Sequence, residues 1–229
     1  MGGRDRVSVI IPWKGGCPHR EAALGWAAGR WSEAGYDVVI GETMGEWCKA
    51  TAVADALPAV GAELLVIADA DVWSPGIDAA VDAVRSGAAW AMPHGPVRRL
   101  THAATCDVLD GADPGPGMDL VQPPYAGWPG GGVVVLPRGL YEQAPFDPRF
   151  VGWSGEDESA AHAWTCLAGP PWRGTAPLWH LWHPPQPRMS RRWGSPEARA
   201  LAGRYRASAR SPERMRALVA EGSSRSSAI

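Results

Sequence analysis

The chain has 229 residues, of which 45% are hydrophobic and 20% charged, and its formal net charge is −2. This length suits one sizeable domain with a continuous core, and it excludes two full enzyme domains, while the composition excludes a disordered chain. No apolar run approaches the roughly 18 residues that cross a bilayer, so we expect no integral membrane segment.

Strand-like and helix-like segments alternate through the first part of the chain. Apolar, β-branched runs predict buried strands, and Ala, Leu and Trp at helical spacing predict helices. The expected elements are a strand over 7–11, a helix over 20–34, a strand over 36–40, a helix over about 47–57 and a strand over 63–68. This order predicts an α/β fold with an open, mainly parallel sheet, helices on both faces, and ligands at the carboxyl ends of the strands.

The second part of the chain has a looser pattern. We expect a helix over 75–85, strands over 88–92 and 132–136, a helix around His162 and Trp164, and a short strand over 178–183. Residues 111–132 are rich in Pro, Gly and Asp, which predicts a long functional or mobile loop. Ser195 and Ser211 each precede Pro-Glu, a pattern typical of helix starts, so two short helices should follow.

The charge is distributed unevenly. Residues 188–229 hold ten Arg and three Glu, about +7, which leaves about −9 on the rest. Such a basic tail suits a phosphate-rich partner, and a solvated Arg-rich helix face explains it equally well. We therefore divide the chain into a catalytic domain over 1–187, a basic helical extension over 188–221 and a disordered tail over 222–229.

Asp69 and Asp71 stand two residues apart at the end of an apolar strand. At that position both carboxylates can approach one hard cation such as Mg²⁺ or Mn²⁺. A cation there would neutralise the charge that develops on a diphosphate as a glycosidic bond breaks. Because D-x-D also occurs in turns and helix caps, its place after a buried strand is what favours a metal site.

Glu156, Asp157 and Glu158 are consecutive acids that follow a Trp among small residues. Adjacent carboxylates repel one another, so a folded protein seldom keeps them near a pocket without a cation, a substrate or a helix N-terminus to offset the charge. Both a functional site and the first turn of a helix fit this segment.

His180 and His183 belong to the aromatic segment over 178–183. We expect both rings on the same face of a short strand. A neutral imidazole is a good further ligand for a transition metal, so at least one of the two should join the carboxylates, with His183 ahead of His180.

Together these features resemble the nucleotide-sugar glycosyltransferases of the GT-A fold, in particular family 2 and the galactosyltransferase C-terminal domain. The resemblance covers roughly residues 6–187. Residues 152–157, Gly-Trp-Ser-Gly-Glu-Asp, are similar to the family's G-W-G-G-E-D segment, with Ser154 in place of a Gly. The resemblance implies a Rossmann-like sheet, Mn²⁺ or Mg²⁺ as cofactor, and a nucleotide-diphosphate sugar as donor, with a UDP-sugar favoured.

The resemblance also implies functions for single residues. Asp157 would be the general base of an inverting displacement, and Glu156 would hydrogen-bond the transferred or accepting sugar. The implied metal ligands are Asp71, Asp69, His183 and His180. The implied nucleotide-binding residues are Pro12, Trp13, Lys14, Glu42, Lys49, Asp69 and Ala70. The implied sugar- and acceptor-binding residues are Trp128, Gly131, Gly132, Trp153 and Gly155.

Two other functions stay open at this point. A sugar nucleotidyltransferase also places acids at the end of a strand, although residues 12–16 match its Gly-rich, basic loop poorly. A catalytically silent scaffold that binds a nucleotide, a sugar or a partner is the other alternative.

The acceptor and the source are less sharply defined. A glycan or protein acceptor is favoured, and modified DNA stays open through the basic tail. The Ala, Arg, Gly and Pro bias favours a GC-rich bacterium or a bacteriophage. Four scattered Cys without a C-x-x-C pair favour reduced thiols and a cytoplasmic protein, in the host cytoplasm if a phage encodes it.

Overall fold

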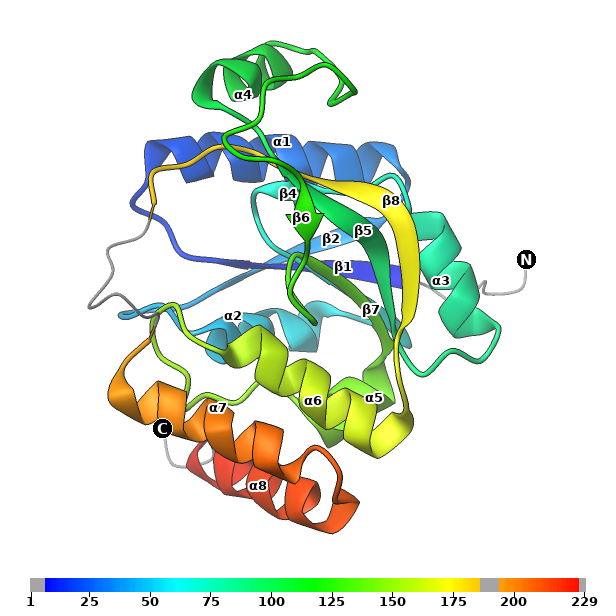
Figure 1. Cartoon of the computed structure of the whole chain (residues 1–229), viewed down its shortest axis with the longest axis vertical. Helices are drawn as coiled ribbons and strands as arrows, with labels where there is room; N and C mark the ends of the chain where they lie inside the picture. The colour runs from blue at the N-terminus through cyan, green and yellow to red at the C-terminus, as the bar shows by residue number, and fades with distance from the viewer. Residues whose placement is uncertain (1–6, 186–193, 227–229) are drawn as a thin grey trace.

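The computed structural model of the chain describes residues 7–185 and 194–226, with side chains described to Ser223 in the last helix. An eight-stranded sheet crosses the centre of the molecule in the order β2-β1-β3-β7-β5-β8-β4, with β6 paired to β5 (Figure 1). The strands are β1 (Val7–Trp13), β2 (Asp37–Glu42), β3 (Leu64–Ala68), β4 (Val72–Trp73), β5 (Ala91–Arg99), β6 (Tyr125–Ala126), β7 (Val133–Pro137) and β8 (Trp172–His180).

Helices cover both faces of this sheet, which confirms the α/β class and the open sheet flanked by helices. The helices are α1 (Pro18–Glu33), α2 (Lys49–Ala56), the 3₁₀ turn η1 (Leu57–Ala59), α3 (Ile77–Arg85), α4 (His102–Leu109), α5 (Arg138–Gln143), α6 (Glu156–Ala168), α7 (Pro196–Ser208) and α8 (Pro212–Ser226). In the described part of the chain, no helix is both long and apolar enough to span a membrane.

The sheet contains the parallel strands that the sequence predicted, together with antiparallel strands that it did not predict. β1 pairs in parallel with β2 and β3, and β5 pairs in parallel with β8, but β7, β4 and β6 run antiparallel to their neighbours. β7 begins at Val133, opposite Ala68 at the carboxyl end of β3. A strand that begins at that edge must run back along β3, which explains the reversal.

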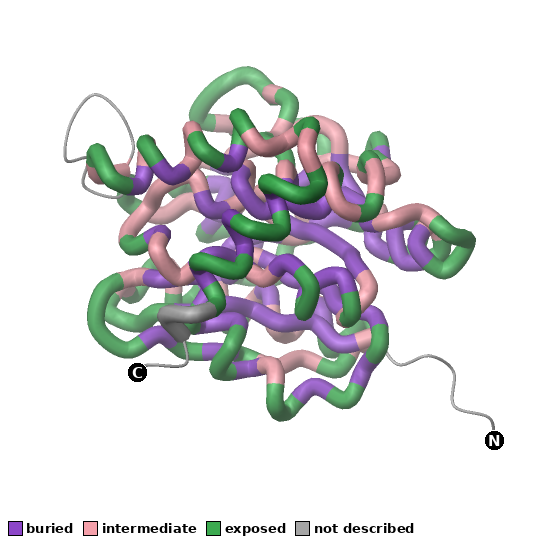
Figure 2. Tube along the Cα trace, turned by 90° about the horizontal axis from the view of Figure 1, so that it is seen from below, coloured by how far each residue is buried: buried purple, intermediate pink, exposed green. Residues whose placement is uncertain are grey.

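Alternating side chains of the central strands form two separate cores. On one face, Ile10, Leu65 and Ile67 pack with buried residues of α2, α5, α6, α7 and α8. On the other face, Val9 and Val66 pack with buried residues of α1 and α3. This division follows from the two-residue period of a strand, since neighbours in sequence point to opposite faces. Figure 2 shows the buried residues concentrated along these strands.

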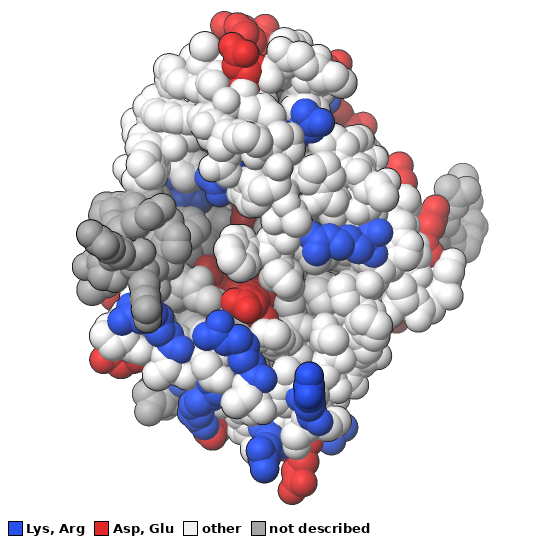
Figure 3. Space-filling view, viewed as in Figure 1, with Lys and Arg blue, Asp and Glu red and all other residues white. Residues whose placement is uncertain are grey.

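The two C-terminal helices begin at the predicted caps and are part of the main body. The Ser195 hydroxyl accepts from the Ala198 amide, as expected for a helix start. Basic side chains gather over α7 and α8 (Figure 3). Leu201, Tyr205 and Met215 are nonetheless buried in the same core as α6. The two helices of the basic extension therefore pack into the core as a layer of the fold.

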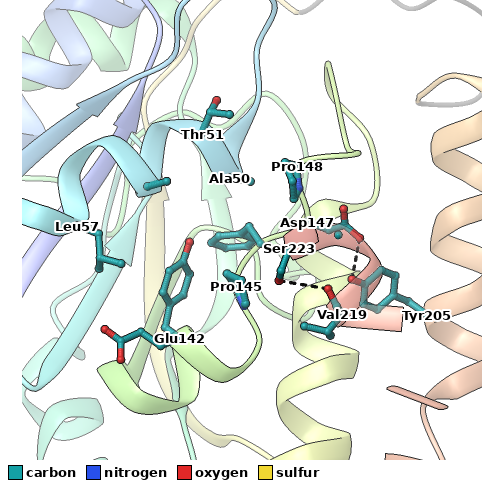
Figure 4. Close-up of a pocket in the computed structure, with 14 residues that line it drawn as sticks. Ala50, Thr51, Leu57, Glu142, Pro145, Asp147, Pro148, Tyr205, Val219 and Ser223 are labelled. Atoms are coloured by element: carbon teal, nitrogen blue, oxygen red, sulfur yellow. Dashed lines mark hydrogen bonds between the residues drawn. The ribbon is translucent and has the colours of Figure 1, made fainter. Parts of the chain in front are cut away.

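Asp147 connects α7 and α8 to the loop that precedes Trp153. The Tyr205 hydroxyl donates to Asp147 over 2.9 Å, beside a cavity of about 310 Å³ that lies between α2, residues 145–148 and the C-terminal helices (Figure 4). Arg149 pairs with both Asp147 and Glu221, over 2.6 and 3.0 Å.

Three other expectations differ from the structure. Helices α4 and α5 and the short strand β6 were not predicted. β5 continues to Arg99, well past the expected end at 92, because β8 pairs along its length. Helix α8 continues to Ser226, into the tail over 222–229 that was expected to be disordered, whereas residues 227–229 and the proposed domain boundary at 187–188 lie outside the described residues.

Candidate active site

The candidate residues gather where the carboxyl ends of β1, β2 and β3 meet. These strands pair in parallel, so the loops that follow Trp13, Glu42 and Ala68 leave the sheet at one edge. The Asp69 amide donates to the Gly132 carbonyl over 2.8 Å, which joins this edge to the start of β7. An acidic patch is visible near the centre of the face in Figure 3, above the basic side chains of α7 and α8.

Asp71 is buried and faces both histidines. Nε2 of His183 lies 3.3 Å from Oδ2 of Asp71, and Nε2 of His180 lies 3.8 Å from Oδ1. The Leu181 amide donates to the Asp71 carbonyl over 2.9 Å, which holds the two chain segments side by side. One carboxylate oxygen and two imidazole nitrogens lie within 4.8 Å of one another, and we call these three residues the Asp71 group.

The two histidines do not share a strand face, so that expectation was wrong. β8 ends at His180, and His183 lies in the loop beyond it. Residues three apart on one strand would point to opposite faces. It is the change of direction after His180 that brings the second ring back to Asp71.

In both imidazoles of the Asp71 group, Nε2 is the nitrogen that faces the carboxylate. Nδ1 of His180 lies 2.7 Å from the Leu181 carbonyl oxygen, and Nδ1 of His183 lies 2.8 Å from the Pro184 carbonyl oxygen. A carbonyl oxygen only accepts, so each Nδ1 carries a proton, and Nε2 holds a free lone pair when the ring is neutral. Burial lowers the pKa of His180 to about 4, which keeps that ring neutral at neutral pH. A lone pair that faces a carboxylate calls for a cation between them, and this donor set fits a divalent transition metal.

Arg20 of α1 is a site residue that the sequence gave no reason to select. Its Nη2 lies 3.5 Å from Oδ2 of Asp71, and its guanidinium lies 4.6 Å from the centre of the Trp153 ring. Its Nε is buried and has no hydrogen-bond partner among the described residues. Burial opposes ionisation of Asp71, but His180 in its protonated form, Arg20 and protonated His183 outweigh it, and the pKa of this carboxyl lies below its ordinary value.

Asp69 faces away from the Asp71 group, toward a lysine. Nζ of Lys49 lies 2.8 Å from Oδ1 of Asp69 and 2.7 Å from Oδ1 of Asp157, and we call these three residues the Lys49 group. From the sequence, Asp69 was expected to bind the metal and Lys49 to bind the nucleotide. In the structure the two residues pair with each other, because the chain turns at residues 70–71, between β3 and β4, and separates the Asp69 side chain from that of Asp71.

The two adjacent acids at the start of α6 differ in their surroundings. Burial raises the pKa of Asp157, and nearby Asp69 adds to the rise, while Lys49 opposes it. Burial and the charge of Asp157 raise the pKa of Glu156 to about 8. The Glu156 carboxyl accepts from the Ser154 amide over 3.2 Å. Glu156 is thus a buried, mostly protonated group that supports its own turn, whereas Asp157 faces the site.

A glycine turn lies against Asp157. A Cβ on Gly130, whose φ is +77°, would lie 2.4 Å from the Asp157 carbonyl oxygen. A Cβ on Gly131 would lie 3.6 Å from Oδ2 of Asp157, and one on Gly132 would lie 2.5 Å from the Leu178 side chain. Buried His94 is another residue near the site that was not predicted from the sequence. Its Nε2 lies 3.2 Å from the Gly131 carbonyl oxygen. Gly130 and Gly132 therefore allow a close approach that a residue with a side chain would not.

Three tryptophans lie near these acids. The rings of Trp47 and Trp153 stack with centres 5.2 Å apart, and the Gly152 amide donates to the Trp47 carbonyl over 2.7 Å. Trp128, just before the glycine turn, is 71% exposed. Gly155 packs close to α7, since a Cβ there would lie 3.1 Å from the Ala202 side chain.

The predicted nucleotide-binding residues separate into buried and exposed sets. Pro12 and Trp13 lie within β1 and are buried, as is Ala70, so their side chains belong to the core. Lys14 and Glu42 are exposed, and the Lys14 ammonium donates to the Gly45 carbonyl. A ligand at this edge would thus meet the Lys14 and Glu42 side chains.

No model of a protein family matches the sequence, and no curated protein matches it. Among solved structures, the fold is similar to glucosyl-3-phosphoglycerate synthase from Mycobacterium tuberculosis, with a TM-score of 0.44 and 16% identity over 80% of this chain and 73% of that chain. It is also similar to a Drosophila β-1,4-galactosyltransferase 7, with a TM-score of 0.43 and 13% identity over 74% of this chain and 65% of that chain. The first was solved with Mn²⁺, UDP and glucosyl-3-phosphoglycerate, and the second with manganese, UDP-Gal and xylobiose. Both likenesses concern the arrangement of the chain, and neither assigns a function to a residue of this protein.

Proposed function

We propose that this chain is a metal-dependent glycosyltransferase that moves a sugar from a nucleotide-diphosphate sugar to an acceptor hydroxyl. One observation carries the proposal: a donor set for a divalent cation, the Asp71 group, and a partly buried carboxylate fit to act as a base, Asp157, are joined through Asp69 and Lys49. A cation in the Asp71 group would stabilise the departing diphosphate, and Asp157 would accept the proton of the attacking hydroxyl. The site therefore has one group for the leaving side and one for the attacking side of a sugar transfer.

The Asp71 group would hold Mn²⁺ or Mg²⁺ through one carboxylate oxygen and two Nε2 atoms. Imidazole ligands favour Mn²⁺ over the harder Mg²⁺. When bound, such an ion supplies charge stabilisation for a diphosphate leaving group. Arg20, with an Nε that has no partner in the described chain, adds a fixed positive charge beside Asp71.

Asp157 would take the proton of the acceptor hydroxyl as the acceptor oxygen attacks the anomeric carbon. A carboxyl with a raised pKa accepts a proton more readily near neutral pH than an ordinary Asp does. Attack on one face of the sugar while the diphosphate leaves from the other inverts the anomeric centre. A UDP-sugar donor, a glycan or protein acceptor and this inversion follow from the family resemblance and remain part of the proposal.

A panel of UDP-, GDP- and TDP-sugars tests the proposal through thermal shift and release of the nucleotide. We expect at least one donor to raise the melting temperature with Mn²⁺ and less without it, since a ligand that binds only the folded state stabilises it. The same donor should be hydrolysed slowly, with water in place of the acceptor. Metal-independent shifts, or no release of nucleotide from any donor, would contradict the proposal.

A further inference from the structure

Lys49 is one of only two lysines in a chain that holds 20 arginines, and it lies between two catalytic-site acids. It is the first residue of α2, and its side chain is only 4% exposed. The other lysine, Lys14, is exposed. Taking an ammonium group out of water costs several kcal/mol unless it is paired and hydrogen-bonded. Two carboxylates within 2.8 Å meet that need for Lys49.

The Lys49 group is negative as a whole while both acids are ionised. One ammonium balances one of the two carboxylates, and the Phe146 ring, whose centre lies 5.2 Å from Nζ, closes the apolar side. If Asp157 gained a proton, Lys49 and Asp69 would remain as a balanced pair. A set of charges away from water is more stable when its net charge is zero. This arrangement therefore favours proton uptake at Asp157, and Lys49 keeps Asp69 as its partner.

The two oxygens of Asp157 have different surroundings. Oδ1 accepts from Lys49, whereas Oδ2 faces Gly131, and no described residue hydrogen-bonds to Oδ2. Because Gly131 has no side chain, the space beside Oδ2 stays open. One oxygen is thus anchored and the other is available.

We propose that Lys49 is a positioning residue: it anchors Oδ1 of Asp157 so that Oδ2 faces the acceptor hydroxyl. Its second contact, with Asp69, holds this carboxylate close to the Asp71 group. The inference rests on the proposed function. In the step, the acceptor O–H bond breaks and its proton goes to Oδ2. The acceptor oxygen forms the new bond to the anomeric carbon, and the bond from that carbon to the diphosphate oxygen breaks, with the electron pair leaving on the diphosphate.

The first test compares Lys49→Met with Lys49→Arg, using the donor that wild type hydrolyses with Mn²⁺. Lys49→Met should lower kcat by about 100-fold or more, the scale of a misplaced base, while the KM for the donor changes less. Lys49→Arg keeps the charge and should recover a large part of the loss. Arg204→Met, which breaks an exposed pair with Glu221 away from the site, is the matched control and should stay near wild type.

The pH dependence of kcat adds a readout that a structural defect alone would not move. The charged groups around Asp157 are Lys49 from α2, Asp69 after β3 and Glu156 on its own helix. Without the ammonium, the acidic limb of the profile should move to higher pH in Lys49→Met. A kcat within threefold of wild type, or a loss expressed only in donor KM, would overturn the inference while the proposed function still stood. A wild type without donor turnover would instead contradict the proposed function.

A second test does not depend on how well Lys49→Met folds. Protein labelled with ¹⁵N-lysine should give ammonium signals from two side chains alone, and the buried Lys49 signal should exchange slowly with water. Asp157→Asn should shift the Lys49 signal and leave that of exposed Lys14 in place. A Lys49 signal that Asp157→Asn leaves unchanged would overturn the contact on which the inference rests.

Discussion

Asp69 and Asp71 are two residues apart in the chain, but they lie in contrasting surroundings. Asp71 faces the Nε2 atoms of two imidazoles and lies 3.5 Å from Nη2 of Arg20. Asp69 faces Lys49, which also holds Asp157. One group combines a carboxylate with two imidazole nitrogens, a donor set that fits a metal ion, and the other pairs two carboxylates with one ammonium of the protein.

The comparison shows that a D-x-D pair need not be one metal site. The chain turns at residues 70–71, so the two carboxylates point to different partners and a short motif reaches two groups at once. We interpret the Asp71 group as serving the departing diphosphate and the Lys49 group as serving the attacking hydroxyl. Four substitutions test whether the two groups act separately.

The largest effect should come from Asp157→Asn. An amide cannot accept the acceptor proton, so kcat should fall by about 10²–10⁴-fold, while Mn²⁺-dependent donor binding stays close to wild type. Steady-state transfer and donor titration measure the two separately. If donor binding were lost together with transfer, the two groups would not be separable.

Asp71→Ala should give the opposite pattern. Loss of a residue that only hydrogen-bonds to a metal ligand typically weakens metal binding by about 10- to 100-fold. Removing the Asp71 carboxylate, a ligand itself, should weaken Mn²⁺ binding by more than that. A titration with Mn²⁺ that is monitored by electron paramagnetic resonance measures the free ion. The pairing of Lys49 should survive, so an altered Lys49 ammonium signal in this variant would argue against two groups.

Gly130→Ala should disturb the Lys49 group from the backbone side. The new Cβ would lie 2.4 Å from the Asp157 carbonyl oxygen at a φ of +77°, so we expect a loss of about 1–3 kcal/mol in the free energy of unfolding. Gly139→Ala is the matched control, because no atom lies within 4 Å of its Cβ. Chemical denaturation compares the two, and an equal effect would mean that the turn is not held against Asp157.

Glu156→Gln should give the smallest change, one that depends on pH. The pKa of Glu156 is about 8 in the folded protein and 4.5 ordinarily. Between these values the folded state holds a proton that the unfolded state has released, so this group's contribution to stability falls as the pH rises. Gln removes that dependence. The melting temperature of the variant relative to wild type should therefore be higher at pH 8 than at pH 5, and a constant difference would contradict the assignment.

The sequence predicted the first half of the fold well because each strand there is a local apolar run. The β1-α1-β2-α2-β3 order and the capped start at Ser195 follow from such local signals. The antiparallel β7 could not be predicted, since its direction depends on which edge of β3 the chain reaches after a long connection. Helix α4 lies in a stretch without a clear amphipathic pattern, although Thr101 caps it.

The candidate site could be predicted in its acids but not in their partners. Asp71, Asp157 and the histidines belong to recognisable patterns, and the structure brings them to one edge of the sheet. Arg20 is one of 20 arginines and His94 a single buried histidine, so neither has a sequence signal of its own. The pairing of Lys49 with both acids joins residues 20 and 108 positions apart, which only the folded chain shows.

The most direct test of the account is calorimetric titration of UDP into the protein with and without Mn²⁺, in wild type, Asp71→Ala and Asp157→Asn. We predict that Mn²⁺ strengthens UDP binding in wild type and in Asp157→Asn, and that Asp71→Ala loses this increment. UDP affinity that does not depend on Mn²⁺, or an increment that survives in Asp71→Ala, would contradict the assignment of the metal to the Asp71 group.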